Sequence, residues 1–123
     1  MIAASLLLGL AAQAPETGYP VEVPRRFWGE YNDKLEHCGT GRSEHRLRIS
    51  GTALQFWETL GEIRAVLRQP DGSVTILADM ASEGHGWSDM SQLILSKDGR
   101  RLTIRGAQSA DSPAYTFVRV RCP

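Results

Sequence analysis

The chain has 123 residues, of which 14 are basic and 14 acidic, so its formal net charge is zero. This length predicts a single domain. The balanced charge argues against a dedicated nucleic-acid-binding protein, because such proteins carry a clear basic excess.

The first residues resemble a secretory leader. Residues 1–12 are uncharged and mostly apolar, and the first charged residue is Glu16. This run is too short to cross a bilayer, which needs about 20 residues, but it fits the apolar core of a signal peptide. Ala12 and Ala14 give the small-x-small form of a cleavage site. We therefore expect a signal peptide over 1–14 and a periplasmic or secreted protein with no transmembrane segment. A buried N-terminal helix is the alternative, because no Lys or Arg precedes the apolar run.

Residues 15–25 predict an extended arm or linker. They include Pro15, Pro20 and Pro24, and proline interrupts helices and is a poor residue for a central strand. A single β-domain is expected to follow over 26–123.

Alternation of apolar residues dominates the rest of the chain and predicts an all-β protein. Leu47 and Ile49 share one face of a short strand, and Leu102 and Ile104 share one face of another. Together with the turns between them, about eight strands are expected. The expected strands cover residues 27–31, 46–50, 53–58, 63–67, 74–78, 87–96, 102–104 and 114–122. Because no segment after the leader shows a helical period, we expect an up-and-down antiparallel meander, closed into a barrel or folded into a sandwich.

Four short segments mark the expected connections. Residues 70–72 (Pro-Asp-Gly) and 97–100, with Asp-Gly at their centre, are turn signals. Residues 32–37 predict a short helical turn. Residues 84–86 (Gly-His-Gly) predict a loop before the long strand that starts at Trp87.

The two cysteines, Cys38 and Cys122, predict one disulfide if the protein is exported. His37 and His45 lie close to Cys38, but their spacing matches no standard zinc motif. We therefore expect no metal site, and nothing in the chain indicates a cofactor.

The segment Phe27-Trp28-Gly29-Glu30-Tyr31 at the start of the strands resembles the calycin barrels, such as the lipocalins, whose first strand carries Gly-x-Trp. Here Tyr31 stands at the third position. The whole domain is also similar to a family of small exported bacterial proteins of unknown function. The shared positions are Phe27-Trp28-Gly29, Cys38, Leu54, Phe56, Glu58, Glu83-Gly84, Trp87, Leu95-Ser96, Asp98-Gly99, Tyr115 and Arg121-Cys122. This resemblance implies export and a compact β fold, and it implies no catalytic residues.

The expected ligand-binding residues are Trp28, Tyr31, His85 and Trp87. Glycines flank His85, so this segment could form a mobile rim in which Trp87 supplies a ring for stacking. The other two residues would add aromatic surface to the barrel mouth.

Two further sequence patterns concern the same end of the expected barrel. Phe56 and Trp57 cannot both face inward in a regular strand, so one of them should be exposed. Trp87, Asp89 and Ser91 share the apparent inner face of their strand, which indicates either a polar-lined mouth or a bulge that shifts the phase.

No catalytic residues are expected. His85, Ser88 and Asp89 lie within five residues, but neighbours in a strand point to opposite faces, and a triad needs convergence in space. The leading hypothesis is a monomeric, non-enzymatic, lipocalin-like binding protein for a small molecule or an envelope protein.

Two alternatives remain open. An inhibitor of a lytic enzyme would act through the loops at 39–45 or 82–87, and a hydrolase would use a convergent site that the sequence does not reveal. An apolar internal cavity of a few hundred Å³ favours a ligand carrier, whereas a filled core with a protruding loop favours an inhibitor.

Overall fold

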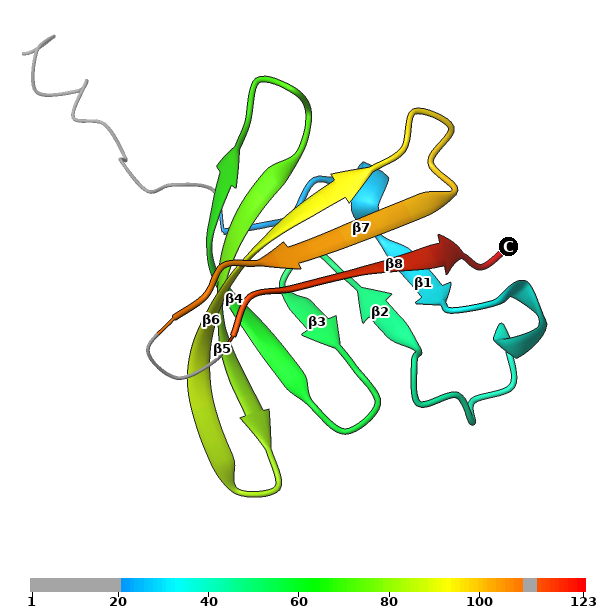
Figure 1. Cartoon of the computed structure of the whole chain (residues 1–123), viewed down its shortest axis with the longest axis horizontal. Coiled ribbons are helices and arrows are strands. Elements are labelled where there is room, and N and C mark those ends of the chain that lie inside the picture. Colours follow the sequence, from blue (N-terminus) through cyan, green and yellow to red (C-terminus); the bar gives the residue numbers. More distant parts are fainter. Residues whose placement is uncertain (1–20, 110–112) are drawn as a thin grey trace, which may run out of the picture.

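The computed structural model describes residues 21–109 and 113–123. The predicted signal peptide over 1–14 and the first part of the predicted arm lie outside the described residues. The described chain forms a closed antiparallel barrel of eight strands (Figure 1). The strands are β1 (Gly29–Asn32), β2 (Leu47–Ile49), β3 (Ala53–Gln55), β4 (Leu60–Arg68), β5 (Val74–Ser82), β6 (His85–Leu95), β7 (Arg101–Gly106) and β8 (Tyr115–Arg121).

The topology confirms the predicted up-and-down meander and selects the barrel over the sandwich. Each strand pairs with the next one in the chain, and β1 pairs with β8 to close the ring. This closing seam is short, with Tyr31 opposite Arg121 and Asn32 opposite Val120. Within the described residues, no helix has the length and hydropathy needed to cross a membrane.

Strands of unequal length make the two halves of the barrel different. β1, β2 and β3 have 4, 3 and 3 residues, whereas β4, β5 and β6 have 9, 9 and 11. The β5–β6 hairpin therefore extends well past the ends of the short strands (Figure 1). We call the end at which this hairpin projects the open end, and the end at which the N-terminal segment enters the closed end.

The aromatic segment at the start of the domain departs from the prediction. Phe27 lies in a 3₁₀ turn, η2 (Arg25–Phe27), and the first strand begins only at Gly29. The amides of Phe27 and Trp28 donate to the carbonyls of Pro24 and Arg25, both at 3.0 Å. A proline just before the turn suits it, because its missing N–H is not needed there. The turn directs Phe27 into the barrel, where it is completely buried.

The predicted loop at 84–86 is also wrong, because His85 and Gly86 already belong to β6. They pair with Ser82 and Ala81 of β5. The chain reverses at Glu83 and Gly84, whose φ angles are 50° and 75°. Two consecutive residues with positive φ match the twist of a hairpin, so the β5–β6 ladder continues to its tip. By contrast, the predicted helical turn within 32–37 is confirmed as η3 (Leu35–His37).

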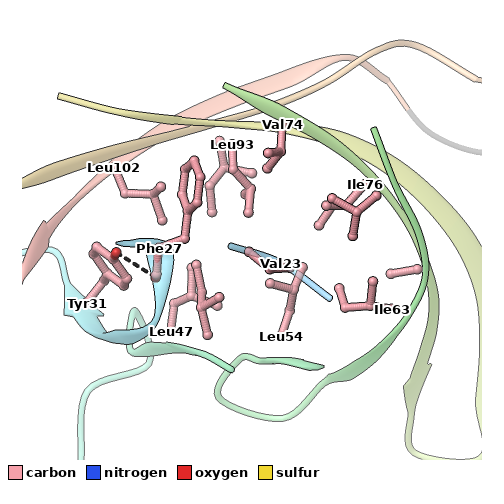
Figure 2. Close-up of a cluster of buried hydrophobic side chains, with 14 of the residues drawn as sticks. Val23, Phe27, Tyr31, Leu47, Leu54, Ile63, Val74, Ile76, Leu93 and Leu102 are labelled. Carbon is pink, nitrogen blue, oxygen red and sulfur yellow. Dashed lines mark hydrogen bonds between the residues drawn. The ribbon is translucent and has the colours of Figure 1, made fainter. Parts of the chain in front are cut away.

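Apolar side chains fill the interior of the barrel (Figure 2). Val23 and Phe27 lie among side chains from the strands, so the end of the predicted arm is part of the closed end. Among residues 21–109 and 113–123, fifteen buried side chains form this core: Val23, Phe27, Tyr31, Leu47, Ile49, Leu54, Ile63, Val66, Val74, Ile76, Ala78, Met80, Leu93, Leu102 and Ile104.

Hydrogen bonds hold the N-terminal segment across the closed end. The Val23 amide donates to the Gly51 carbonyl at 2.8 Å, and the Trp28 indole Nε1 donates to the Val23 carbonyl at 2.8 Å. A Cβ at Gly51 would lie 2.8 Å from the Trp28 ring, so the β2–β3 turn needs a glycine at this position. The Tyr31 hydroxyl donates to the Phe27 carbonyl at 2.8 Å.

Arg121 connects the last strand to the same segment. Its Nη2 donates to the Tyr31 hydroxyl and to the Arg26 carbonyl, both at 2.5 Å, and approaches the Trp28 carbonyl at 3.3 Å. The guanidinium also lies 5.1 Å from the centre of the Tyr31 ring. Burial raises the pKa of Tyr31, although Arg121 opposes this shift. The phenol therefore stays protonated and can donate to the Phe27 carbonyl.

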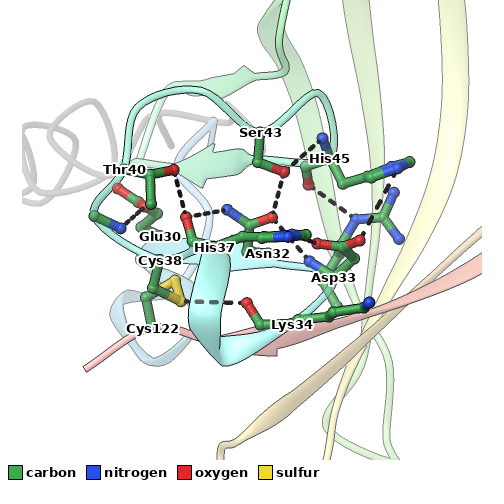
Figure 3. Close-up of a disulfide and its surroundings, with 12 residues drawn as sticks. Glu30, Asn32, Asp33, Lys34, His37, Cys38, Thr40, Ser43, His45 and Cys122 are labelled. Atoms are coloured by element: carbon green, nitrogen blue, oxygen red, sulfur yellow. Dashed lines mark hydrogen bonds and ion pairs between the residues drawn. A yellow bond between two sulfur atoms is a disulfide. The ribbon is translucent and has the colours of Figure 1, made fainter.

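The predicted disulfide is confirmed. Cys38 and Cys122 are bonded, with their Cα atoms 5.6 Å apart (Figure 3). Cys38 directly follows η3, and the Cys122 amide donates to the Glu30 carbonyl of β1 at 2.8 Å. The bond therefore fixes the β1–β2 loop to the C-terminus beside the closing seam.

Removing the disulfide should lower the free energy of unfolding without abolishing the fold. The bond spans 84 residues, and a loop of this size corresponds to about 4–5 kcal/mol in the chain-entropy model. Urea unfolding of the oxidised protein and of a Cys38→Ser/Cys122→Ser variant measures the difference. Equal midpoints would contradict the importance of the bond. Adding a reductant should destabilise only the wild type.

Candidate functional site

A cleft of about 530 Å³ lies at the open end of the barrel. Aromatic rings from separate segments form its walls, and the side chain of Met80 contributes to its lining. These rings belong to Phe56, Trp57, Trp87, Tyr115 and Phe117. We call this site the open-end cleft.

The β3–β4 turn supplies one wall. Phe56 packs against the core, whereas Trp57 is 40% exposed, which confirms that the two neighbours face different environments. The turn is closed by a 2.8 Å hydrogen bond from the Phe56 amide to the Thr59 carbonyl. Ser82 also donates to the Glu58 carbonyl at 2.9 Å. The turn is thereby attached to the end of β5.

The inner face of β6 supplies the second wall. Trp87, Asp89 and Ser91 lie opposite Met80, Ala78 and Ile76 in an unbroken register. The register contains no bulge here, so the polar residues belong to the lining of the barrel.

The start of β8 supplies the third wall. The Tyr115 and Phe117 rings stack with their centres 5.9 Å apart. The Tyr115 hydroxyl donates to Asp89 Oδ2 of β6 at 2.7 Å. Burial, followed by the hydrogen bond to Asp89 and the charge of that carboxylate, raises the pKa of Tyr115. The phenol is therefore held as a neutral hydrogen-bond donor.

A glycine makes room for this ring. Gly106 of β7 pairs with both Tyr115 and Ser91, and a Cβ at Gly106 would overlap the Tyr115 ring. The Tyr115 side chain thus lies directly across the backbone of β7. This packing sets the position of the ring in the cleft.

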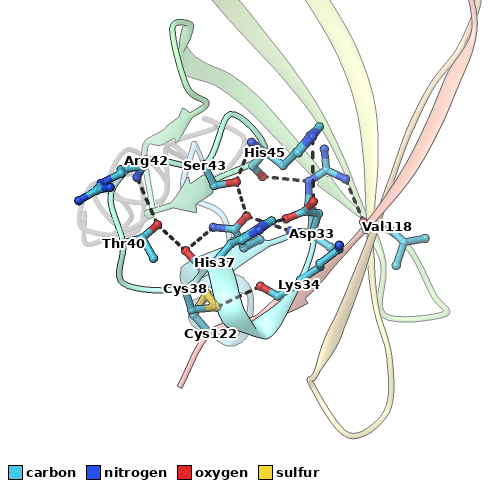
Figure 4. Close-up of polar contacts among 12 residues, drawn as sticks. Asp33, Lys34, His37, Cys38, Thr40, Arg42, Ser43, His45, Val118 and Cys122 are labelled. Carbon is cyan, nitrogen blue, oxygen red and sulfur yellow. Dashed lines mark hydrogen bonds and ion pairs between the residues drawn. A yellow bond between two sulfur atoms is a disulfide. The ribbon is translucent and has the colours of Figure 1, made fainter.

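The β1–β2 loop reaches the rim of the cleft through Glu44, and a polar cluster holds this loop in place (Figure 4). His37 Nδ1 lies 2.7 Å from Asp33 Oδ1, and His45 Nε2 lies 4.0 Å from Asp33 Oδ2. The hydrogen bond from His37 is the main cause that lowers the pKa of Asp33.

Arg119 and Asn32 attach the same loop to the barrel. Arg119 Nε donates to the His45 carbonyl and its Nη1 to the Val118 carbonyl, both at 3.0 Å. The Ser43 hydroxyl donates to the buried Asn32 side chain at 2.7 Å. In the described part of the chain, no three His, Cys, Asp or Glu side chains gather as a metal site would require.

The four residues predicted to bind ligand fall at opposite ends of the barrel. Trp87 lines the open-end cleft, and the His85 ring lies 5.5 Å from the Trp87 ring. Tyr31 is completely buried at the closed end, and Trp28 packs partly buried beside it. The structure therefore brings the predicted residues together as two separate pairs.

Several cleft residues were not among the predicted ligand-binding residues. Tyr115 and Phe117 alternate along the last strand, and this spacing was the available signal for a shared inner face. Glu44 and Glu58 carried no such signal, because they lie in irregular segments whose positions depend on the tertiary fold. The only sequence signal at Asp89 was a polar residue at a position where the alternation along the strand would place an apolar one.

The fold and the cleft together define a small barrel with one filled half and one open, aromatic end. Comparisons with protein-family models, with curated proteins and with solved structures found no match to the chain. The functional assignment therefore depends on the chemistry of the site.

A Gly106→Ala substitution should move Tyr115 and open its hydrogen bond to Asp89. The added methyl group would overlap the ring, and overpacking of this kind costs about 1–3 kcal/mol. Urea unfolding and the NMR shifts of the Tyr115 ring report the two effects. Gly86→Ala is the matched control, because its Cβ would come no closer than 3.4 Å to another atom. Equal effects of the two substitutions would contradict the packing described for Tyr115.

Proposed function

We propose that the protein is an exported, non-enzymatic binding protein that holds a small ligand in the open-end cleft. The observation that carries the proposal is the convergence of five aromatic rings around about 530 Å³ of space. This volume lies within the range of about 300–1,000 Å³ that is usual for small-molecule sites, which combine apolar walls with a few polar groups.

The division of the barrel supports the same function. The closed half is packed with side chains and held by hydrogen bonds, so it acts as a rigid support. The cleft lies at the other end, where Trp57 and Trp87 remain 40% and 38% exposed. Exposed large aromatic rings that lie close together are typical of binding sites.

The disulfide supports export, because such bonds persist mainly in oxidising compartments. The arrangement around His85 supports a non-enzymatic role. Asp89 faces into the cleft and accepts from Tyr115, whereas Ser88 is exposed on the neighbouring position of the strand. The three residues that could suggest a triad therefore do not converge.

Mass spectrometry of protein purified natively from the cell envelope tests the proposal. We expect a chain cleaved after Ala14, an intact disulfide and a small molecule that is released on denaturation. Trp87→Ala should abolish the retained ligand. Met90→Ala is the matched control, because Met90 lies on the same strand, is 58% exposed and points out of the barrel. A ligand-free wild type, or equal retention by both variants, would contradict binding in the cleft.

A protein-directed inhibitor is the second candidate, and the filled core together with the projecting β5–β6 hairpin favours it (Figure 1). The hairpin carries the exposed His85 and Glu83 at its tip. An inhibitor would block a cell-wall lytic enzyme in stoichiometric amounts. A Glu83→Lys/His85→Ala variant would lose this effect and still retain a ligand in the cleft, which separates the two functions.

A further inference from the structure

We propose that the ligand of the open-end cleft is a small organic cation, such as an amine or a quaternary ammonium compound. This inference rests on the proposed function and adds the chemical class of the ligand. It comes from the charges and the ring faces that surround the same space.

Carboxylates supply the charge of the lining. Glu44 comes from the β1–β2 loop, Glu58 from the β3–β4 turn and Asp89 from β6. Apart from the Tyr115 phenol, they are the ionisable groups among the described residues that line the cleft. An anionic ligand would meet three like charges there, whereas a cation would meet three opposite ones.

Asp89 is the best placed of the three. It is partly buried on the inner face of β6, whereas both glutamates are exposed. Tyr115 donates one hydrogen bond to its Oδ2 atom. Because an ionised carboxylate can accept about four hydrogen bonds, Asp89 keeps the capacity to accept from an ammonium N–H group or to face a quaternary nitrogen.

The aromatic rings favour the same class of ligand. The faces of Trp and Tyr rings carry negative potential, and cations bind there within about 6 Å of the ring centre. Trp57, Trp87 and Tyr115 come from three different segments and line one space. Neutral apolar ligands also fit aromatic walls, but they would cover the Asp89 carboxylate without supplying a counter-charge.

Two basic side chains, Arg119 and His85, contact aromatic rings of the lining, and both are already engaged. The Arg119 guanidinium lies 4.5 Å from the centre of the Phe117 ring and donates to the His45 and Val118 carbonyls. The Arg119 guanidinium is therefore held in place in the wall of the cleft. It is an example of a cation that lies over one of the aromatic rings of the lining. His85 contacts Trp87 at the hairpin. One guanidinium beside three carboxylates leaves a net negative charge.

Three probes of similar shape and different charge test the inference. They are phenyltrimethylammonium, neutral tert-butylbenzene and anionic 4-tert-butylbenzoate, each titrated against the full exported protein with tryptophan fluorescence as the signal. We expect the cation to bind about tenfold or more tightly than the neutral probe, and the anion to bind most weakly.

Matched variants connect the preference to the carboxylates. Asp89→Asn keeps an acceptor for Tyr115 but removes the charge. It should therefore weaken binding of the cation about tenfold and leave the affinity for the neutral probe unchanged. Glu58→Gln, at an exposed turn where folding is not at risk, should have a smaller effect in the same direction. Glu62→Gln is the control, because Glu62 is exposed on β4 and does not line the cleft.

The outcomes separate this inference from the proposed function. If the neutral probe binds as tightly as the cation, or the anion binds more tightly, the inference that the ligand is a cation is wrong. The proposal that the cleft binds a ligand would still stand. If no probe binds, the charge of the ligand retained by the natively purified protein decides the inference. If no probe binds and no ligand is retained, both proposals fail.

Discussion

In the described residues the barrel closes through a short ladder, in which Tyr31 pairs with Arg121 and Asn32 with Val120, and the rest of the structure depends on this seam. So short a ladder needs support from other contacts. Arg121 provides part of it, because one guanidinium nitrogen bonds to the Tyr31 hydroxyl and to the η2 backbone. The Cys38–Cys122 bond provides the rest by fixing the chain on either side of the seam.

The short seam also explains why one end of the barrel is open. Because β1 ends at Asn32, the first half of β8 has no strand beside it on that side, and the β1–β2 loop takes its place. Arg119 and the cluster around Asp33 hold this loop against the barrel. The closed end gains a tightly packed core, and the open end gains a cleft with walls from a loop, a turn and two strands.

Much of the fold could be predicted from the sequence, because alternation and turn signals are local. All eight strands were expected, as were the turns at 70–72 and 97–100 and the disulfide. The errors came from tertiary context. Phe27 is aromatic and strand-like, yet it enters the barrel on a 3₁₀ turn. Gly86 suggested a loop, yet the positive φ angles of Glu83 and Gly84 let the ladder reach the hairpin tip.

The lining of the open-end cleft could be predicted only in part, because no local pattern says which end of a barrel a side chain faces. The sequence placed Trp87 at this end because it directly follows the Gly-His-Gly segment at 84–86. Trp28 and Tyr31 have the same aromatic character, but they lie at the closed end. The Tyr115 ring is placed in the cleft by packing on Gly106 and by its hydrogen bond to Asp89. These residues are 9 and 26 positions away in the sequence. Such pairings depend on strand register, which the sequence does not reveal directly.

The three tryptophans of the chain allow one direct test of the central claim. Trp57 and Trp87 line the open-end cleft, whereas the Trp28 indole N–H is bonded to Val23 at the closed end. In a ¹H–¹⁵N NMR titration with the ligand recovered from the protein, or with phenyltrimethylammonium, the indole signals of Trp57 and Trp87 should shift and that of Trp28 should stay. A shift confined to Trp28, or three unmoved signals at saturating ligand, would contradict a binding site in the open-end cleft.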